Sequence, residues 1–208
     1  MTTFTYVAGA VVLGVIVSFV VSSLLNSLKG SRWFYFPIIL LPWMIPKVAI
    51  AIMWKWMLHD IYGIFNIILV NAHILNNPFH WLGHPVTAML ALILADVWYR
   101  APFSILLLYA GMQRVPKEIH DASVMDGANS WQYFRYVILP YIKPELLISL
   151  VVTTMFVFRE FGLPFVLTNG GPGDATKVLA LTIYRQGNLL LRQGYASALS
   201  VMMLLITV

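Results

Sequence analysis

The sequence predicts an all-α, polytopic membrane helix bundle. Of its 208 residues, 60% are hydrophobic and only 10% are charged, whereas soluble domains contain about 25% charged residues. The apolar residues also gather into runs of the length that a helix needs to cross a hydrocarbon core of about 30 Å. No internal repeat or linker divides these runs, so we expect residues 1–208 to form a single transmembrane domain with about five spans.

The predicted spans differ in how regular they are. The first is a nearly unbroken apolar run, whereas the third contains the charged residues Asp96 and Arg100 and also Pro102. The second contains Pro42 and Pro46, and prolines remove backbone hydrogen bonds, so a kink is expected there. The fourth contains Gly162 and Pro164, which predict a break and an irregular outer half. The predicted spans are 4–28, 34–58, 86–112, 145–167 and 194–208, of which the last is shorter than usual.

The segment 115–144 carries many charges and cannot lie in hydrocarbon without a large desolvation cost. Its pattern predicts a helix that begins at Pro116 and stops at Gly127, followed by a second amphipathic run that leads to Pro140. A connector of this kind is more often a solvated loop than a partner-facing helix, so the residues alone favour the loop. Its charged residues are Lys117, Glu118, Asp121, Asp126, Arg135 and Lys143.

Three motifs in this chain resemble those of ABC importer permeases. The triplet 121–123 (DAS), Gly127 and the group 137–140 (VILP) have the spacing of the EAA motif, which is E-A-A, three residues, G, nine residues and I-x-L-P. The triplet 126–128 (DGA) is similar to the carbohydrate-uptake branch of that family. The run 167–172 (LTNGGP) is similar to the external L-T-x-G-G-P signature of its maltose-type and glycerol-phosphate-type permeases.

The resemblance implies the type I importer permease fold and a coupling helix that fits a groove on a cytoplasmic ATPase subunit. Asp121 replaces the family's Glu and Ser123 replaces its Ala, and both changes are small enough for docking to survive. We expect Gly127→Asp to abolish coupled uptake without preventing membrane insertion. The docking residues that the resemblance implies are Glu118, Asp121, Ala122, Ser123, Asp126 and Gly127.

The resemblance also implies that the chain works in an assembly in the plasma or inner membrane. Its implied partners are a second, non-identical permease, two cytoplasmic ATPase subunits and an external solute-binding protein. The chain has no nucleotide-binding Gly-Lys-Ser/Thr loop, so we expect a transport subunit that is not an enzyme, needs no cofactor itself and leaves ATP to its partner. Family members carry a further span before the first one here and a cytoplasmic tail, so we expect a chain truncated at both ends.

Charged and aromatic residues inside the spans are candidates for the substrate path, because sugars are commonly held by aromatic faces and charged hydrogen-bond partners. Asp96 and Arg100 are four residues apart and share a helix face, either as a structural pair or as a wall of the path. Arg159 and Glu160 are adjacent and point about 100° apart, so at least one of them is expected to need a partner elsewhere in the assembly. The candidates are Lys47, Trp98, Arg100, Arg159 and Glu160.

The distribution of positive charge predicts that the segment 115–144 faces the cytoplasm. In that orientation six basic residues lie inside and three lie outside, as the positive-inside rule requires. The net charge of +5 is scattered along the chain, so we expect no nucleic-acid partner. The inner residues are Lys29, Arg32, Arg114, Lys117, Arg135 and Lys143, and the outer ones are Lys177, Arg185 and Arg192.

Other functions fit the sequence less well. An importer for a non-sugar solute such as glycerol phosphate is the nearest alternative. An intramembrane enzyme would need a nucleophile and base at suitable spacing, which the spans do not show. A self-sufficient channel would not require a partner-facing helix. His80 and His84 are four apart but lack a third ligand of obvious spacing, so we expect no metal site.

Overall fold

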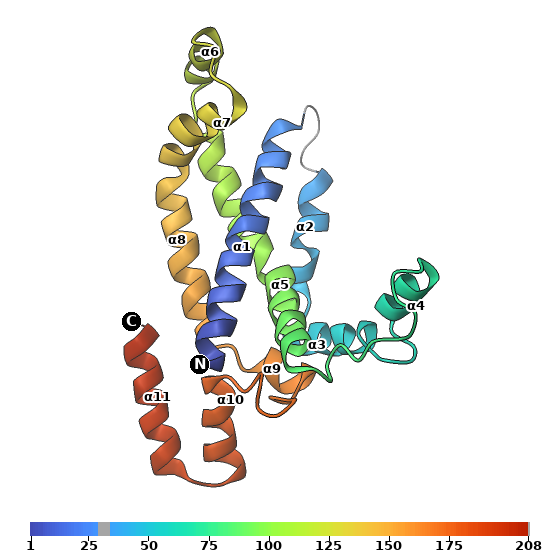
Figure 1. Ribbon diagram of the computed structural model, residues 1–208. Helices are drawn as coiled ribbons and strands as arrows, with labels where there is room; N and C mark the ends of the chain where they lie inside the picture. Colours follow the sequence, from blue (N-terminus) through green and yellow to red (C-terminus); the bar gives the residue numbers. More distant parts are fainter. Residues whose placement is uncertain (29–33, 208) are drawn as a thin grey trace.

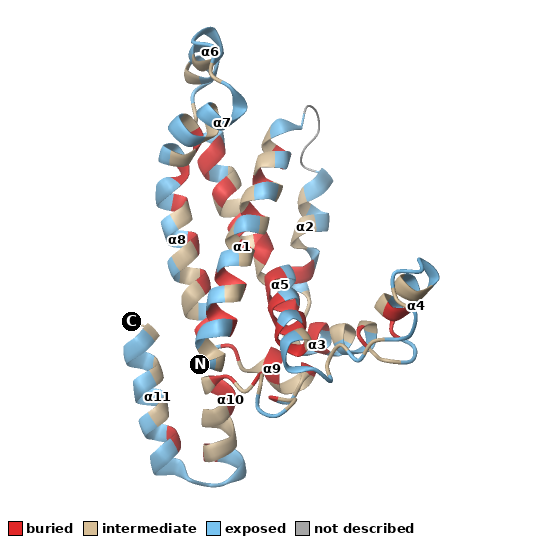
Figure 2. Cartoon of the chain, in the orientation of Figure 1, coloured by how far each residue is buried: buried red, intermediate tan, exposed pale blue. Residues whose placement is uncertain are grey.

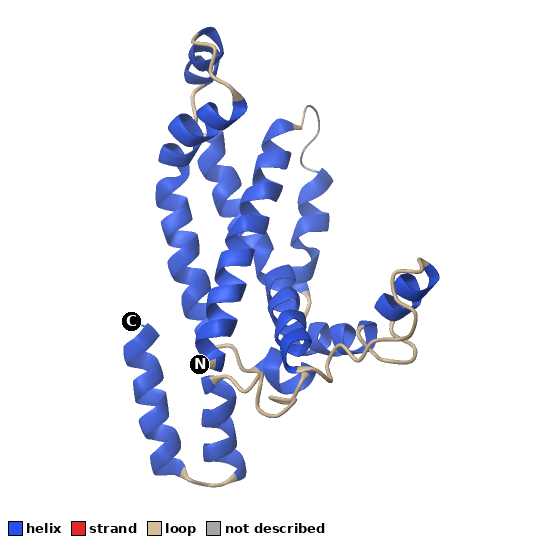
Figure 3. Cartoon of the chain, in the orientation of Figure 1, coloured by secondary structure: helices blue, strands red, loops and turns tan. Residues whose placement is uncertain are grey.

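The computed structural model describes residues 1–28 and 34–207, and every regular element in these ranges is a helix (Figure 3). The all-α prediction is therefore confirmed. Lys29 and Arg32, which belong to the predicted inner connector, lie outside the described residues. The elements are α1 (Thr2–Ser27), α2 (Tyr35–Met44), α3 (Lys47–Met57), α4 (Ile64–Asn71), α5 (Pro85–Gln113), α6 (Lys117–Met125), α7 (Ser130–Tyr133), η2 (Phe134–Ile138), α8 (Leu139–Phe158), α9 (Gly162–Leu167), α10 (Leu179–Tyr184), η3 (Arg185–Leu189) and α11 (Gln193–Thr207).

Three long helices, α1, α5 and α8, form the body of the molecule (Figure 1). Each belongs to a helical stretch long and apolar enough to cross a membrane, and the stretch that ends with α8 runs from Ser130 to Phe158. The first and third predicted spans are confirmed as α1 and α5. Pro102 lies inside α5 without ending it, as membrane helices permit when neighbours satisfy the freed backbone groups.

Helix α1 meets α5 along a stripe of small residues spaced four apart. Ala10, Gly14, Ser18 and Ser22 are all buried, and the Ser22 hydroxyl donates to the Ile105 carbonyl at 2.9 Å. Small side chains let two membrane helices approach closely, which replaces the hydrophobic driving force that lipid does not supply. On the other side of α1 lies a stripe of exposed branched side chains, which suits a lipid-facing surface (Figure 2): Val12, Ile16, Val20 and Leu24.

The second predicted span is broken rather than kinked. Helices α2 and α3 meet at 97° across the break between Met44 and Lys47, so they do not form one continuous rod. The physical reason is that Pro42 and Pro46 both withhold a backbone N–H, and Ile45 between them is extended. Lys47 consequently begins a new helix that runs across the bundle instead of along it (Figure 1).

The described residues account for four of the predicted spans with helices or a helix pair of spanning length, and for the fifth with the shorter helix α11. They contain three helices of spanning length, or four if α2 and α3 are counted as one broken span. Helix α11 is an apolar helix of 15 residues and corresponds to the last predicted span, which was expected to be shorter than the others. The fourth predicted span is shifted, because α8 already begins at Leu139 and ends before Arg159, and α9 follows as a separate short helix.

An arm around α4 projects from the side of the bundle (Figure 1). Its fold depends on the buried side chain of Asn66, whose amide nitrogen donates to the carbonyls of Asp60 at 2.9 Å and Phe79 at 3.0 Å. The amide oxygen of Asn66 accepts from the Phe79 N–H at 3.1 Å and from the Trp81 indole at 2.8 Å. One side chain thus joins both ends of the loop that carries α4.

Candidate functional site

Four charged side chains meet where the second and fourth predicted spans break. The Glu160 carboxylate accepts from the Lys47 ammonium at 2.6 Å and, through the same oxygen, from the Arg100 guanidinium. Arg100 also donates from Nε to both oxygens of Asp96, at 2.8 and 2.9 Å. We call Lys47, Asp96, Arg100 and Glu160 the ion quartet.

The helix breaks explain how the ion quartet assembles. Lys47 is the first residue of α3, and Glu160 lies between α8 and α9, where its second oxygen accepts from the Leu163 N–H at 3.2 Å. Both carboxylate side chains are almost fully buried, at 1% exposure for Asp96 and 3% for Glu160. A carboxylate at this depth would be costly alone, so the two cations are needed to keep both carboxylates in place.

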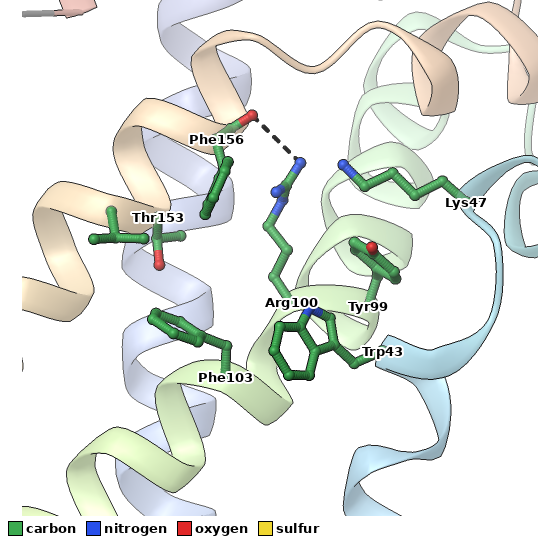
Figure 4. A pocket seen from close by; sticks show the side chains of 8 residues that line it. Trp43, Lys47, Tyr99, Arg100, Phe103, Thr153 and Phe156 are labelled. Carbon is green, nitrogen blue, oxygen red and sulfur yellow. Dashed lines mark hydrogen bonds between the residues drawn. The ribbon is translucent and has the colours of Figure 1, made fainter.

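A cavity of about 370 Å³ opens beside the ion quartet between α2, α5 and α8 (Figure 4). The Lys47 ammonium lies 5.0 Å from the centre of the Tyr99 ring, and the Arg100 guanidinium lies 5.9 Å from that of Phe156. Aromatic faces beside cationic hydrogen-bond donors suit a ligand that has both apolar ring faces and oxygen atoms. We call this cavity the pocket; it is lined by Trp43, Lys47, Tyr99, Arg100, Phe103, Val152, Thr153 and Phe156.

The structure brings together three of the five candidate path residues. Lys47 and Arg100 line the pocket, and Glu160 pairs with both of them. Trp98 does not line the pocket; its ring lies 6.5 Å from that of Trp54. Arg159 is exposed and also lies outside the pocket lining. Glu160 therefore finds its charge partners, Lys47 and Arg100, within this chain and not elsewhere in the assembly.

Sequence reasoning missed the aromatic lining. Tyr99 and Phe103 lie four apart on α5 beside Arg100, and Thr153 and Phe156 lie three apart on α8. The helical spacing of aromatic and polar residues around Arg100 is a signal that could have selected Tyr99 and Phe103. Trp43 could not have been selected this way, because its position depends on the angle between α2 and α3.

Residues 115–138 lie beyond the ends of α5 and α8 (Figure 1). We call the whole predicted segment 115–144, which also includes the first turns of α8, the elbow. Helix α6 begins just after Pro116, which caps the helix rather than occupying its first turn. It ends at Gly127, whose φ of +71° places it in the left-handed region that glycine adopts most easily. The N–H groups of Gly127 and Ala128 donate to the carbonyls of Val124 and Ser123, each at 3.0 Å, which is a Schellman termination.

The six predicted docking residues all lie on α6 or at its C-terminal end, and none is buried. The Ser123 hydroxyl donates to the His120 carbonyl at 2.6 Å, so it is engaged within the helix. The second part of the elbow begins with a capping box, in which Asn129 and Gln132 each accept from the other's backbone N–H. Large exposed side chains also mark the elbow: Val124, Met125, Trp131 and Tyr136 are between 62% and 88% exposed.

An ion pair closes the base of the elbow. Arg114, at the end of α5, pairs with the Glu145 carboxylate on α8, and Arg114 also donates to the Tyr141 carbonyl at 3.4 Å. Glu145 fits against Gly111, where an added Cβ would lie 3.0 Å from the Glu145 carboxyl carbon. Glycine at that position therefore lets the carboxylate reach Arg114.

The glycine-rich loop lies at the opposite end of the bundle from the elbow (Figure 1). The buried Thr176 hydroxyl donates to the Gly171 carbonyl at 2.7 Å, and Arg185 donates to the Asn169 carbonyl at 2.5 Å. A hydrogen bond from Lys177 lowers the pKa of Asp174 below its ordinary value of 3.8, and nearby Arg185 adds to the effect. The loop therefore has a defined shape despite its glycines.

The two histidines considered as metal ligands, His80 and His84, lie in the arm around α4. The His80 ring nitrogen lies 2.7 Å from the Asp60 carboxylate. Within residues 1–28 and 34–207, no three histidine, aspartate or glutamate side chains gather as a metal-binding group would require.

Broken membrane helices, an aromatic pocket with two cations at the breaks and an exposed elbow are compatible with a membrane transport subunit. Residues 10–208 match the family described as the binding-protein-dependent transport system inner membrane component. The chain belongs to this family. Like the members of this family, it is a multi-pass inner-membrane protein.

Curated relatives support this assignment. The chain is 37% identical over 182 residues to the trehalose/maltose transport system permease protein MalF of Thermococcus litoralis, which covers 86% of this chain and 60% of that protein. It is 32% identical over 165 residues to the sulfoquinovosyl glycerol transport system permease protein SmoG of Agrobacterium fabrum, covering 79% of this chain and 53% of that protein. The chain thus spans little more than half the length of these two relatives.

A solved structure confirms the fold. The chain is similar to a chain in the crystal structure of a bacterial ABC transporter involved in the import of the acidic polysaccharide alginate, with a TM-score of 0.87 and 21% sequence identity. The match covers 99% of this chain and 72% of the transporter chain. The predicted ABC importer permease fold is therefore confirmed.

Proposed function

We propose that this chain is a permease subunit of a binding-protein-dependent ABC importer for a carbohydrate. In this proposal the pocket belongs to the substrate path, and the elbow couples it to a cytoplasmic ATPase. ATP binds to the partner, and the chain itself needs no cofactor. The remaining partners are a second, non-identical permease, a second ATPase subunit and an external solute-binding protein.

The observation that carries the proposal is the exposure of the elbow. No residue between Gln113 and Val137 is buried, although α6 ends in a Schellman motif and α7 begins with a capping box. Val115, Tyr133 and Phe134 pack against the buried Ile138 and Ile142 at the base of the elbow. Helix α6, in contrast, has a well-formed C-terminal end but no buried residue, so it is suited to packing against another protein. Met125, at 88% exposure, and Trp131, at 69%, are apolar side chains that such a partner would cover.

Coupling then requires only that the elbow fits one nucleotide state of the ATPase better than the other. The difference between the two docking free energies is the energy available to shift the spans. Arg114 and Glu145 join α5 to α8 at the base of the elbow, so a displacement of the elbow reaches both helices.

Carbohydrate is the proposed cargo because the pocket combines aromatic faces with hydrogen-bond donors. The relatives named above transport trehalose or maltose and sulfoquinovosyl glycerol, according to their names. Glycerol phosphate is the alternative cargo, and it differs from a simple sugar chiefly in its negative charge.

The test uses the absence of cysteine from the chain, since every introduced thiol is then unique. Met125→Cys on the elbow should cross-link to a co-expressed ATPase subunit, and an impermeant maleimide should label it only from the cytoplasmic side. Asp174→Cys, which is on the opposite loop, is the matched control and should be labelled from outside without cross-linking. Labelling of Met125→Cys from outside, or solute uptake without any ATPase subunit, would refute the proposal.

A further inference from the structure

We propose that Asp96 and Glu160 set the charge selectivity of the pocket, by holding it electrically neutral so that it accepts an uncharged saccharide and rejects an acidic one. This inference rests on the proposed function, in which the pocket is part of the substrate path.

The two kinds of charge occupy different positions around the pocket. The cations Lys47 and Arg100 line it, and the Lys47 side chain is 32% exposed (Figure 4). The carboxylates of Asp96 and Glu160 do not line it and are buried behind the cations. A ligand therefore meets donors at the wall, whereas the charges that compensate them lie out of its reach.

The charges of the ion quartet cancel, since it contains two cations and two carboxylates. Arg100 is shared between both carboxylates, and Lys47 is held by Glu160. A negatively charged ligand would be attracted by the nearer cations, but the two buried carboxylates behind them cancel most of that attraction. Little then remains to offset the cost of removing the anion from water. Such interactions are stronger in a protein interior than in water, because the surroundings screen them less.

An uncharged ligand does not meet this opposition. The Lys47 ammonium has three donors, and among the described residues only Glu160 accepts from it. The remaining donors are available to hydroxyl or ring oxygens, and Trp43, Tyr99 and Phe156 supply apolar faces for a sugar ring. The pocket thus offers hydrogen bonds without a net charge.

A purely structural role for the ion quartet predicts a different outcome. In that case the loss of one carboxylate would weaken the binding of all ligands alike, or would lower the stability of the bundle. If Asp96 and Glu160 determine selectivity, the loss of a carboxylate changes the preference between ligands of different charge. The ratio of affinities is therefore the decisive measurement.

The experiment uses the complete importer complex in lipid nanodiscs, without the soluble receptor. Binding of radiolabelled glucose, glucuronate and glucosamine is measured by equilibrium dialysis at about pH 6.5, where the carboxylate is ionised and the amine is protonated. These probes share one ring and differ in charge. The variants are Glu160→Gln, Lys47→Gln and the double variant, which respectively give the pocket a positive, a negative and again no net charge.

We expect the wild-type complex to prefer glucose to glucuronate. Glu160→Gln should shift the ratio of the two dissociation constants about tenfold or more toward glucuronate, and Lys47→Gln should shift preference toward glucosamine. The double variant should return to the wild-type order, which also shows that the pocket can fold without this pair. Glu145→Gln removes another buried carboxylate, at the base of the elbow, and should leave the ratios unchanged.

Three results would overturn the inference: a wild-type preference for glucuronate, ratios that do not follow the net charge of the pocket, or no binding of any probe. If Met125→Cys still cross-links to the ATPase subunit in that case, the proposed function survives and only the selectivity argument fails. If the cross-link is also absent, the proposed function fails as well.

Discussion

Arg114 and Glu145 form an ion pair between the last turn of α5 and the first turns of α8, directly beneath the elbow. The two partners differ in exposure, because the Arg114 side chain is 57% exposed and that of Glu145 is 12% exposed. The pair therefore has one partner in a wet environment and one in a nearly dry one.

Removing either charge should have unequal effects. Arg114→Gln leaves an uncompensated, nearly buried carboxylate and should destabilise the complex by about 1–3 kcal/mol. Glu145→Gln leaves an arginine that is already partly in water, so its cost should be smaller. Thermal unfolding of the purified complex measures both, and the idea fails if Glu145→Gln proves the more damaging change.

The end of α6 gives a second prediction. An added Cβ at Gly127 meets nothing within 4 Å, so only the backbone conformation restricts this position. Gly127→Val should strain the helix end by about 1–2 kcal/mol, because branched side chains disfavour positive φ. Coupled uptake should fall several-fold, while membrane insertion should stay intact.

Gly127→Asn is the matched control for that experiment, since asparagine adopts the left-handed conformation more readily than valine. Uptake by the asparagine variant should stay close to that of wild type. Equal loss in both variants would mean that the absence of a side chain, not the backbone angle, is what matters at the elbow.

The contact between α1 and α5 predicts which substitutions in α1 the bundle tolerates. Ser18 is fully buried in the stripe of small residues, and its hydroxyl donates to the Ala101 carbonyl at 3.4 Å. Ser18→Leu should force the helices apart and reduce the yield of assembled protein. Val12→Leu, which changes a residue of the exposed stripe, should leave the yield unchanged. The yield of both variants is measured by gel filtration in detergent, and equal yields would contradict the packing argument.

Asn66 provides a test of the arm. Asn66→Ala removes the side-chain amide, whose nitrogen donates and whose oxygen accepts hydrogen bonds within the arm. The Phe79 N–H and the Trp81 indole N–H then lose their acceptor. We expect a local cost of about 2–4 kcal/mol, seen as faster hydrogen exchange across residues 59–84. Exchange in α5 should remain unchanged beyond its first turn, and a global increase would show that the arm is not an independent unit.

The sequence was sufficient to predict the helical class, α1, α5 and the limits of α6, because each depends on local pattern. Hydrophobic run length predicts a span, and a glycine after a charged amphipathic run predicts a helix end. Gly127 illustrates this, since its predicted role as a stop is confirmed by its φ of +71°.

The pocket could be predicted only in part. Asp96 and Arg100 pair within one helix turn, so spacing alone indicated their contact. Glu160 and Lys47 are 113 residues apart, and they meet only because two helices break at the same place. The angle between α2 and α3 is a tertiary property, and the proline pattern indicated a kink without its size.

The helix breaks at residues 45–46 and 159–161 affect how the surrounding helices can move. An unbroken membrane helix resists bending because backbone hydrogen bonds join each turn to the next, whereas the regular hydrogen-bond pattern is interrupted at these two joints. Rotation of α3 or α9 about its joint would sacrifice few backbone bonds and would instead stretch the contacts among Lys47, Arg100 and Glu160. Both joints lie beside the pocket, so a movement of either helix would change the contacts among the charged side chains next to it.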